Sequence, residues 1–301
     1  MSLSILIPSR TERFLNQTIQ SVLDNATGEF EVLPILDGYG NTPYEKIDDP
    51  RVKYLTLEAN GNQLQKRHGV NKAVSVAKGD HIMCLDAHCM VGKGFDEILA
   101  KDCEDNWMVV PRRYKLDAEK WAINDDQPPV DYEYWMWRYM IGGRGSHGFP
   151  ELHDYRWDEK HFERIDIPID DKLTMQASCW FMHKKWFLDN DIFNPEGYTG
   201  WGSEAEQLCL TTWLTGGQVK VNKNTFYAHL YKGKRWGRMY FMSKDQRDSS
   251  MHYNYDFWIH NRPLKGRIHN FHWVIEKFWP IPNWPDDWRE QIGYKDLPDY
   301  D

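Results

Sequence analysis

Short apolar segments alternate with amphipathic ones through the first 90 residues, and this alternation constrains the fold most strongly. Residues 82–85 are a continuous apolar run between Gly79 and Asp86, which is typical of a buried strand. Similar runs, and segments with apolar residues at helical spacing, occur at 3–7, 30–36 and 51–57 (strands) and at 13–23 and 63–77 (helices). The order strand, helix, strand, strand, helix, strand predicts an open α/β sheet with crossover connections.

Polar side chains follow two of these predicted strands. Asp86 and His88 are two residues apart, so an extended chain would point both to the same face. Parallel sheets bind ligands at the carboxyl ends of their strands, and an oxygen–nitrogen donor set suits a divalent cation such as Mn²⁺. Asp37 adds a second carboxylate, which at a sheet edge needs a cation or a polar partner. The alternatives are a turn aspartate beside an unrelated histidine at 86–88, and a simple Asp-Gly turn at Asp37.

The rest of the chain is less regular. Residues 113–170 mix Pro, Gly, Asp, Trp and Tyr and predict a long loop region, which is often functional at that length. The tail 251–301, rich in Trp, Pro and Asp, predicts an irregular extension packed on the same domain by its aromatic side chains. The remaining expected elements are helices at 95–103 and 205–214 and strands at 107–111, 173–182, 218–221 and 225–230.

Charge and cysteine content narrow the possible classes of protein. The net charge of −8 argues against general polyanion binding, although it is compatible with a local basic channel. The 5 cysteines include no CxxC pair, which favours reduced thiols over a disulfide framework. No apolar run approaches the roughly 18 residues of a membrane span, and the start lacks the basic segment of a signal peptide. We therefore expect a soluble, cytoplasmic protein.

Four segments, in order, resemble nucleotide-sugar glycosyltransferases of the GT-A fold. The likeness is to family-2 enzymes and to the catalytic domain of polypeptide N-acetylgalactosaminyltransferases. The segments are Ser4-Ile5-Leu6-Ile7-Pro8-Ser9-Arg10-Thr11-Glu12, Leu36-Asp37-Gly38, Ala77-Lys78-Gly79-Asp80 through Leu85-Asp86-Ala87-His88-Cys89, and Trp201-Gly202-Ser203-Glu204 with Trp213 and Ala228-His229. Two positions depart from the pattern, with Ala87 in place of Ser and Ser203 in place of Gly. Residues 113–170 do not match well enough to imply a peptide acceptor.

The resemblance implies a Rossmann-like, mixed and mostly parallel sheet flanked by helices. It divides the chain into a catalytic domain at 1–250, with a donor half at about 1–110 and an acceptor half at about 111–250, and the extension at 251–301. It implies that Asp86, His88 and His229 bind Mn²⁺ or Mg²⁺, with Asp86 and Glu204 as the catalytic residues. The residues implied to contact a nucleotide-sugar donor are Pro8, Arg10, Glu12, Asp37, Arg67, Asp86, Ala87, Trp201 and Arg235.

Several roles stay open at this point. Glu204 would be the general base of an inverting enzyme, would hold sugar hydroxyls in a retaining one, or would only favour a helix N-terminus. Arg67 would reach the donor or lie on a solvated helix face. The basic run 232–238, which contains Arg235, would close over the diphosphate, contact an anionic acceptor, or form a solvated loop.

The expected reaction is transfer of a sugar, with retention, from a UDP-sugar to an acceptor hydroxyl. The acceptor would be a carbohydrate, a protein or a hydroxymethylated DNA base, the last as in phage enzymes that decorate their DNA. A different class of protein is also compatible with the sequence, namely a non-catalytic module that binds nucleotide-sugars.

Overall fold

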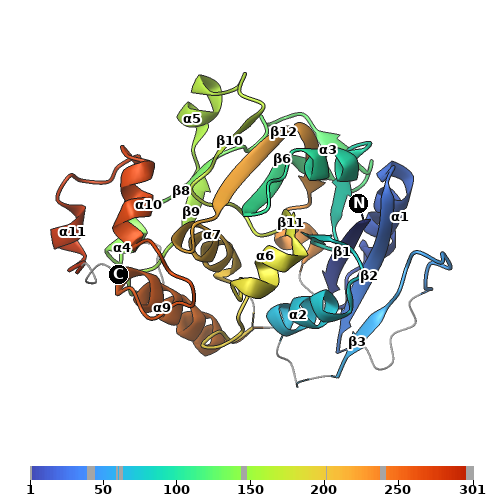
Figure 1. Ribbon diagram of the computed structural model, residues 1–301, viewed down its shortest axis with the longest axis horizontal. Coiled ribbons are helices and arrows are strands. Elements are labelled where there is room, and N and C mark those ends of the chain that lie inside the picture. The colour runs from blue at the N-terminus through green and yellow to red at the C-terminus, as the bar shows by residue number, and fades with distance from the viewer. Residues whose placement is uncertain are drawn as a thin grey trace.

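A ten-stranded mixed sheet forms the centre of the protein, and helices cover its faces (Figure 1). The computed structural model describes residues 2–38, 45–58, 60, 64–143, 148–200, 202–237 and 242–295. The strands in these ranges are β1 (Ser2–Ser9), β2 (Glu29–Asp37), β3 (Leu55–Leu57), β4 (His81–Leu85), β5 (Cys89–Val91), β6 (Trp107–Asp117), β7 (Ala122–Asn124), β8 (Glu133–Trp135), β9 (Asp154–Arg156), β10 (Ile169–Asp171), β11 (Cys179–His183) and β12 (Gln218–His229). The helices are α1 (Leu15–Asn25), α2 (Lys66–Val76), α3 (Phe95–Lys101), α4 (Trp137–Met140), α5 (Asp158–Glu163), α6 (Lys184–Asp189), α7 (Glu204–Leu214), α8 (Gly233–Trp236), α9 (Lys244–Ile259), α10 (Phe271–Lys277) and α11 (Trp288–Gln291).

The directions of the strands bring one end of several strands to a common edge. The order is β10-β12-β6-β11-β4-β1-β2-β3, with β5 on β12 and β7 on β6, and β8 and β9 form a separate pair. Strands β1 to β4 pair in parallel, and so do β6 and β12. Because β11 is antiparallel to both β4 and β6, the two parallel groups run in the same direction. The carboxyl ends of β1, β2, β4 and β12 therefore meet at one edge of the sheet.

The first half of the chain confirms the predicted order of elements, β1-α1-β2-β3-α2-β4. Every residue of β4 is buried, as its apolar run requires. Strand β3 is shorter than the expected 51–57, and upstream of it only the isolated bridge Val32–Val52 continues the pairing among the described residues. Figure 1 looks onto the face of the sheet that α2, α6 and α7 cover.

The middle of the chain differs from the expectation of a long loop region. Residues 113–170 contain the end of β6 together with β7, β8, α4, β9, α5 and β10. These elements are short, so none shows the periodicity that would reveal it in the sequence. The two strands expected at 218–221 and 225–230 are one strand, β12, whose register on β6 shifts between Asn222 and Phe226. A bulge of this kind interrupts the alternation of buried and exposed side chains without ending the strand.

The C-terminal extension packs through its aromatic residues, but the expectation that it is irregular was wrong. It contains most of α9 and all of α10 and α11, and Pro263, Pro280, Pro282 and Pro285 lie between these helices. Trp258, Phe271 and Trp288 belong to the main hydrophobic core, and Trp284 Nε1 donates a hydrogen bond to the Trp135 carbonyl (2.7 Å). The division of the chain into donor half, acceptor half and extension stays a prediction. None of the helices in the described ranges is both long and apolar enough to cross a membrane.

Candidate active site

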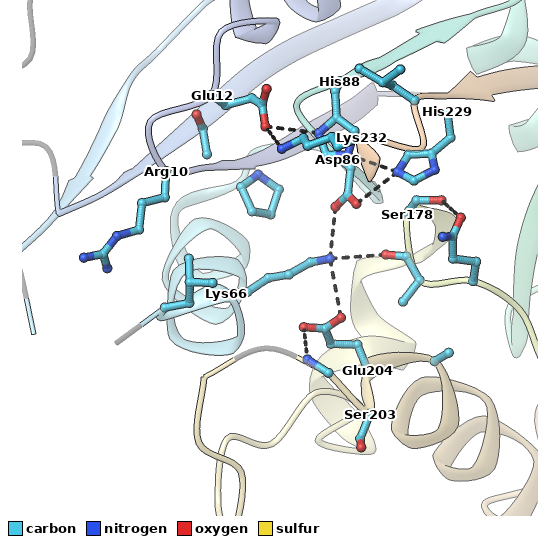
Figure 2. Close-up of a pocket in the computed structure, with 18 of the residues that line it drawn as sticks. Arg10, Glu12, Lys66, Asp86, His88, Ser178, Ser203, Glu204, His229 and Lys232 are labelled. Atoms are coloured by element: carbon cyan, nitrogen blue, oxygen red, sulfur yellow. Dashed lines mark hydrogen bonds and ion pairs between the residues drawn. The ribbon is translucent and has the colours of Figure 1, made fainter. Parts of the chain in front are cut away.

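A cavity of about 530 Å³ lies where the carboxyl ends of the parallel strands meet. Its walls come from the residues that follow β1, β2 and β4, from the start of α2 and α7, and from the end of β12 (Figure 2). Among the predicted site residues it is lined by Pro8, Arg10, Glu12, Asp37, Asp86, His88, Glu204 and His229. The structure thus brings together residues that span more than 200 positions of the chain.

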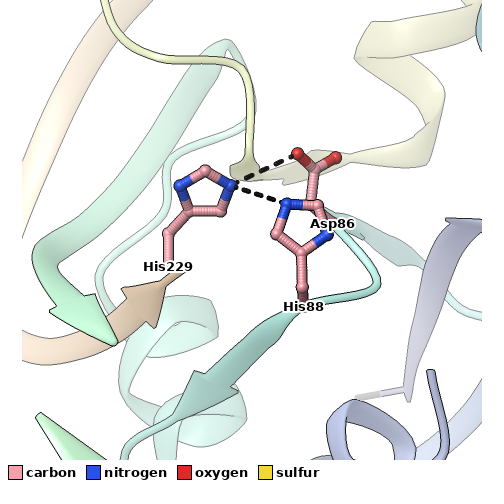
Figure 3. Close-up of side chains that lie close together, drawn as sticks. All are labelled: Asp86, His88 and His229. Carbon is pink, nitrogen blue, oxygen red and sulfur yellow. Dashed lines mark hydrogen bonds and ion pairs between the residues drawn. The ribbon is translucent and has the colours of Figure 1, made fainter. Parts of the chain in front are cut away.

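Asp86, His88 and His229 converge on one point (Figure 3). The Nε2 atoms of the two imidazoles are 3.1 Å apart, and Asp86 Oδ2 lies 3.7 Å from His229 Nε2. One possible ligand atom from each of the three residues lies within 4.8 Å of the other two. Among the described residues, no other group of three or more His, Cys, Asp or Glu side chains could hold a metal ion in this way. Two facing imidazole nitrogens beside a carboxylate oxygen fit a borderline divalent cation.

Pairing of strands places His229 in this group. Strand β5 follows His88 directly and pairs antiparallel with the end of β12, where His229 lies opposite Cys89. The Leu230 amide donates to the His88 carbonyl (3.1 Å), and the Asp86 amide donates to the Ser178 carbonyl (2.8 Å). Each of the three residues is therefore held by backbone hydrogen bonds, so the side chains can keep a fixed geometry.

Glu12 lies behind the histidines. Its Oε2 atom is 3.3 Å from His88 Nδ1 and also contacts the Lys232 ammonium. Burial acts to raise the pKa of Glu12, but His88 and Lys232 outweigh burial and lower it. In metal sites, a carboxylate often contacts the imidazole nitrogen that does not bind the metal, and this contact fixes the orientation of the ring. Glu12 was predicted as a donor contact, and its position also suits this supporting role. Lys232 lines the cavity, so it does not belong to a solvated loop.

Lys66 is a central residue of the site that the sequence did not single out. Its ammonium lies 3.0 Å from Asp86 Oδ1 and 3.8 Å from Glu204 Oε2, between the two carboxylates (Figure 2). Burial acts to lower the pKa of Lys66, but these two carboxylates outweigh burial and raise it above its usual range. The donor contact predicted in this helix was the neighbouring Arg67. The sequence did contain a signal for Lys66, because this residue lies in the first turn of the helix that comes after Asp37.

The protonation states favour a cation. Burial acts to raise the pKa of Asp86, but the charge of Lys66 and the neighbouring imidazoles hold it well below its usual range. Burial lowers the pKa of His229 to about 4. Near neutral pH the group therefore offers a carboxylate and a neutral imidazole, which are the forms that bind metal ions.

One end of the cavity centres on Asp37. Its Oδ2 atom accepts from the Gln65 amide (2.8 Å) and lies 3.6 Å from Arg10 Nη1, and Oδ1 accepts from Gln65 Nε2 (3.1 Å). Ile35 and Leu57 form an apolar wall beside it. Gln65 is a further polar residue that the sequence analysis missed. An apolar wall with a few fixed polar groups is the usual composition of a small-molecule pocket.

Three predicted donor contacts do not line the cavity. Arg67 is 3% exposed, so a solvated helix face is wrong for it. It lies behind the cavity wall, where Nη2 donates to the Gly202 carbonyl (2.9 Å) and its guanidinium stacks on Tyr198. Ala87 is buried and does not line the cavity. Arg235, on α8, pairs with Glu119 at the surface. Trp201 lies outside the described residues.

Glu204 begins α7 and faces the cavity. Its Oε1 atom accepts a hydrogen bond from the Gly202 amide (3.1 Å), and Oε2 faces Lys66. Ser203, which precedes it, has φ of 55°, in the left-handed region that favours glycine. The family resemblance implied glycine at this position, and Ser203 adopts the backbone region that glycine favours.

Two further carboxyl groups that were not predicted, Asp154 and Glu206, also line the cavity. Glu206, two residues into α7, is 5% exposed. Burial and then the charge of Asp154 raise the pKa of Glu206 to about 8, and burial and then Glu133 raise that of Asp154 to about 6. At neutral pH these groups hold at least part of a proton.

Replacing Glu206 with Gln should change how stability depends on pH. Because folding raises the pKa of Glu206, its stabilising contribution is present in acid and is lost as pH rises from about 4.5 toward 8. The natural chain should therefore lose on the order of 2–4 kcal/mol of unfolding free energy relative to Glu206→Gln between pH 5 and 9. Urea unfolding at several pH values measures this. The exposed Glu196→Gln is the control, and parallel curves for Glu206→Gln and the natural chain would contradict the assignment.

Comparisons with known proteins show the family to which this chain belongs. The family model described as "Glycosyl transferase family 2" matches residues 4–189. The putative polypeptide N-acetylgalactosaminyltransferase 13 of Drosophila melanogaster is 25% identical over 177 residues, which are 56% of this chain and 29% of the relative. This chain thus spans less than a third of that relative's length.

Two solved structures share the fold. The crystal structure of GalNAc-T7 with UDP, GalNAc and Mn²⁺ superposes with a TM-score of 0.65 at 17% identity, covering 98% of this chain and 55% of the other. The S. aureus TarS 1-349 complex with UDP-GlcNAc gives a TM-score of 0.51 at 16% identity, covering 81% of this chain and 62% of the other. The expected mostly parallel GT-A sheet flanked by helices is confirmed.

Proposed function

Since this chain belongs to glycosyl transferase family 2 and is a glycosyltransferase of the GT-A fold, we propose that it transfers a sugar from a UDP-sugar to an acceptor hydroxyl, with retention and with the help of a divalent cation. The observation that carries the proposal is the convergence of Asp86, His88 and His229 at the carboxyl edge of the sheet. Family membership favours this enzyme over a non-catalytic module that binds nucleotide-sugars.

The three converging side chains would hold Mn²⁺ or Mg²⁺. A cation bound there stabilises the negative charge that grows on a nucleoside diphosphate as the sugar bond breaks. Lys66 keeps Asp86 ionised and adds a positive charge beside the same place. Glu12 fixes the His88 ring, and Lys232 closes the cavity on this side. These contacts orient the site before a donor binds, which is where most of its catalytic effect would come from.

The end of the cavity around Asp37 suits the nucleoside. The apolar wall of Ile35 and Leu57 would pack against a base, and the Asp37 carboxylate would accept from a base N–H or a ribose hydroxyl. Support for uridine comes from the two solved structures of the same fold, GalNAc-T7 with UDP and TarS 1-349 with UDP-GlcNAc.

Replacing Asp37 with Asn should weaken UDP binding by about 10- to 100-fold, because a hydrogen bond to a charged group contributes roughly 1.5–3 kcal/mol. Isothermal titration calorimetry of UDP in the presence of Mn²⁺ measures the effect. Asp48→Asn, at an exposed aspartate outside the cavity, is the matched control and should bind UDP like the natural chain. Equal affinities for all three proteins would remove Asp37 from the nucleoside site.

Retention is proposed because of how Glu204 is held. Its carboxylate accepts from the Gly202 amide and faces the Lys66 ammonium, so each of its two oxygens already has a partner in the site. Holding sugar hydroxyls suits Glu204 better than removing a proton. Proton NMR of the product distinguishes the two: the donor's anomeric configuration is kept under this proposal and is inverted if Glu204 is the general base.

A DNA acceptor receives less support. Two cations of the basic run 232–238 form ion pairs within the protein: Lys232 with Glu12, and Arg235 with Glu119. These ion pairs reduce the positive charge that is available to bind DNA phosphates.

Incubation with a panel of nucleotide-sugars and Mn²⁺ tests the proposed function. Release of UDP from at least one UDP-sugar, above the level without protein, is expected. A protein that releases no nucleoside diphosphate from any donor would refute the proposed reaction.

A further inference from the structure

A second cavity adjoins the first one. It has a volume of about 370 Å³ and lies over β6, β8 and β9. Asp154, Gln176 and Tyr231 line both cavities and thus form their common boundary. This boundary lies beside Glu206 and on the β6 side of the site, whereas Asp37 ends β2, and β11, β4 and β1 lie between β6 and β2 in the sheet. A substrate in the second cavity would therefore approach the site from the side opposite the nucleoside.

Glu206 points to a ligand at this boundary. Its side chain is buried and lines the first cavity, and within the described ranges its carboxyl group has its own backbone amide as a donor but makes no hydrogen bond or ion pair with another residue. The charged groups that face it are Asp154, Glu204 and Arg67, the first two of which repel its ionised form. A single local amide leaves most of the hydrogen-bonding capacity of a carboxyl group unused. A ligand hydroxyl is the simplest partner that the cavity could supply.

Asp154 stands on a rigid support. It pairs with Trp135 across β8 and β9. Two residues before Trp135 in β8, Glu133 accepts from Arg113 Nη2 (2.7 Å) and lies 3.0 Å from the Lys172 ammonium. The Arg113 guanidinium also donates to Gln176 Oε1, so this buried network fixes two residues of the boundary. A carboxyl and an amide held in place in this way can bind hydroxyl groups with defined geometry.

The aromatic residues of the second cavity suit a sugar ring. Tyr155 and Tyr231 line it and remain 52% and 48% exposed, which is unusual for large side chains at a cavity. Each offers an apolar ring face with a polar hydroxyl at its tip. Two of the three cations that line it are paired, Arg113 with Glu133 and Arg156 with Asp158, and the Asp154 carboxyl group adds negative charge opposite to that of the third, Lys115. These features favour a neutral, polyhydroxylated ring over a phosphate-bearing ligand.

We propose that the second cavity is the acceptor subsite, that it binds a sugar unit of a carbohydrate acceptor against Tyr155 and Tyr231, and that Glu206 and Asp154 bind the acceptor hydroxyl. The assignment rests on the proposed function, because it presumes a donor bound around Asp37 and Asp86. It adds the chemical class of the acceptor and the residues that select it.

The test separates acceptor binding from donor binding. Cellotriose, maltotriose and triacetylchitotriose serve as acceptors, and UDP release above acceptor-free hydrolysis gives the KM. Glu206→Leu and Tyr155→Ala should each raise the acceptor KM by about tenfold or more, while UDP affinity in Mn²⁺ stays within about twofold. Glu206→Gln should keep most of the acceptor affinity, because the amide still binds a hydroxyl. The exposed Glu196→Gln is the control, and thermal unfolding confirms that each variant is folded.

Three results would overturn the assignment in a protein that binds UDP and Mn²⁺. One is an unchanged acceptor KM in Glu206→Leu and Tyr155→Ala. Another is the absence of transfer to any of the three sugars. The last is transfer to a serine- and threonine-containing peptide, or to an oligonucleotide with hydroxymethylcytosine, in place of the sugars. Failure of the natural chain to bind UDP and Mn²⁺ would instead refute the proposed function on which the assignment rests.

Discussion

Replacing Asp86 with Asn is expected to reduce sugar transfer on the order of 10³-fold, the largest loss among single substitutions at the site. Asn keeps the size of the side chain but removes the charge that a cation needs. It also leaves Lys66 without its nearer carboxylate, at 3.0 Å. The kcat for UDP release with a donor and an acceptor measures the effect, and calorimetry with Mn²⁺ shows whether the metal affinity falls with it.

The matched control is Asp80→Asn. Asp80 directly precedes β4, at the end opposite Asp86, and is exposed. Its replacement should leave kcat within about twofold of the natural value, in line with surface substitutions in general. A folded Asp86→Asn protein with natural kcat would show that Asp86 has no part in the reaction.

Replacing Lys66 with Met is expected to lower the free energy of unfolding by about 3–5 kcal/mol in metal-free protein near neutral pH. The substitution leaves two carboxylates, Asp86 and Glu204, facing each other without their shared positive charge. Because Lys66 is among the causes of the lowered pKa of Asp86, the stability that it provides is present above the unfolded pKa and is lost in acid. The difference from the natural chain should therefore shrink as pH falls below about 4.

Urea unfolding of two further variants completes the test. Lys72→Met removes an exposed lysine of the same helix, whose ammonium donates to the Thr56 carbonyl, and should change stability by less than about 0.5 kcal/mol. The double variant Lys66→Met with Asp86→Asn should recover part of the lost stability, because it removes one of the two repelling charges. A loss for Lys66→Met that is the same at every pH would point to lost packing and away from the ion pair.

Two of the three residues of the candidate metal site could be predicted because they are near neighbours in the sequence. Asp86 and His88 follow an apolar run that has the length of a buried strand. The extended chain expected at 86–88 was wrong, because these residues form a turn in which the His88 amide donates to the Asp86 carbonyl (2.8 Å). His229 was predicted only from another segment of the family resemblance, 141 positions after His88. What the sequence could not show is the pairing of β5 with the end of β12, which brings that histidine within 3.1 Å of His88.

Other parts of the site gave no readable signal. Lys66 and Arg67 are adjacent in a helix with a weak apolar pattern, and only the position of the helix on the sheet decides that Lys66 faces Asp86. Asp154 lies in a three-residue strand, too short for alternation to be visible, and Glu206 is placed by the rotation of α7. The helical C-terminal extension was missed because its aromatic residues occur all around the helices, and its prolines suggested a loop.

The binding of UDP with and without a metal ion tests the central claim most directly. Calorimetric titration of the protein with UDP should give one site per chain in Mn²⁺, and an affinity at least about 100-fold lower after the metal is removed with EDTA. The His229→Ala variant should bind UDP in Mn²⁺ as weakly as the natural chain does in EDTA. UDP binding of equal affinity in Mn²⁺ and in EDTA, by both proteins, would contradict the claim that Asp86, His88 and His229 hold the cation that binds the diphosphate.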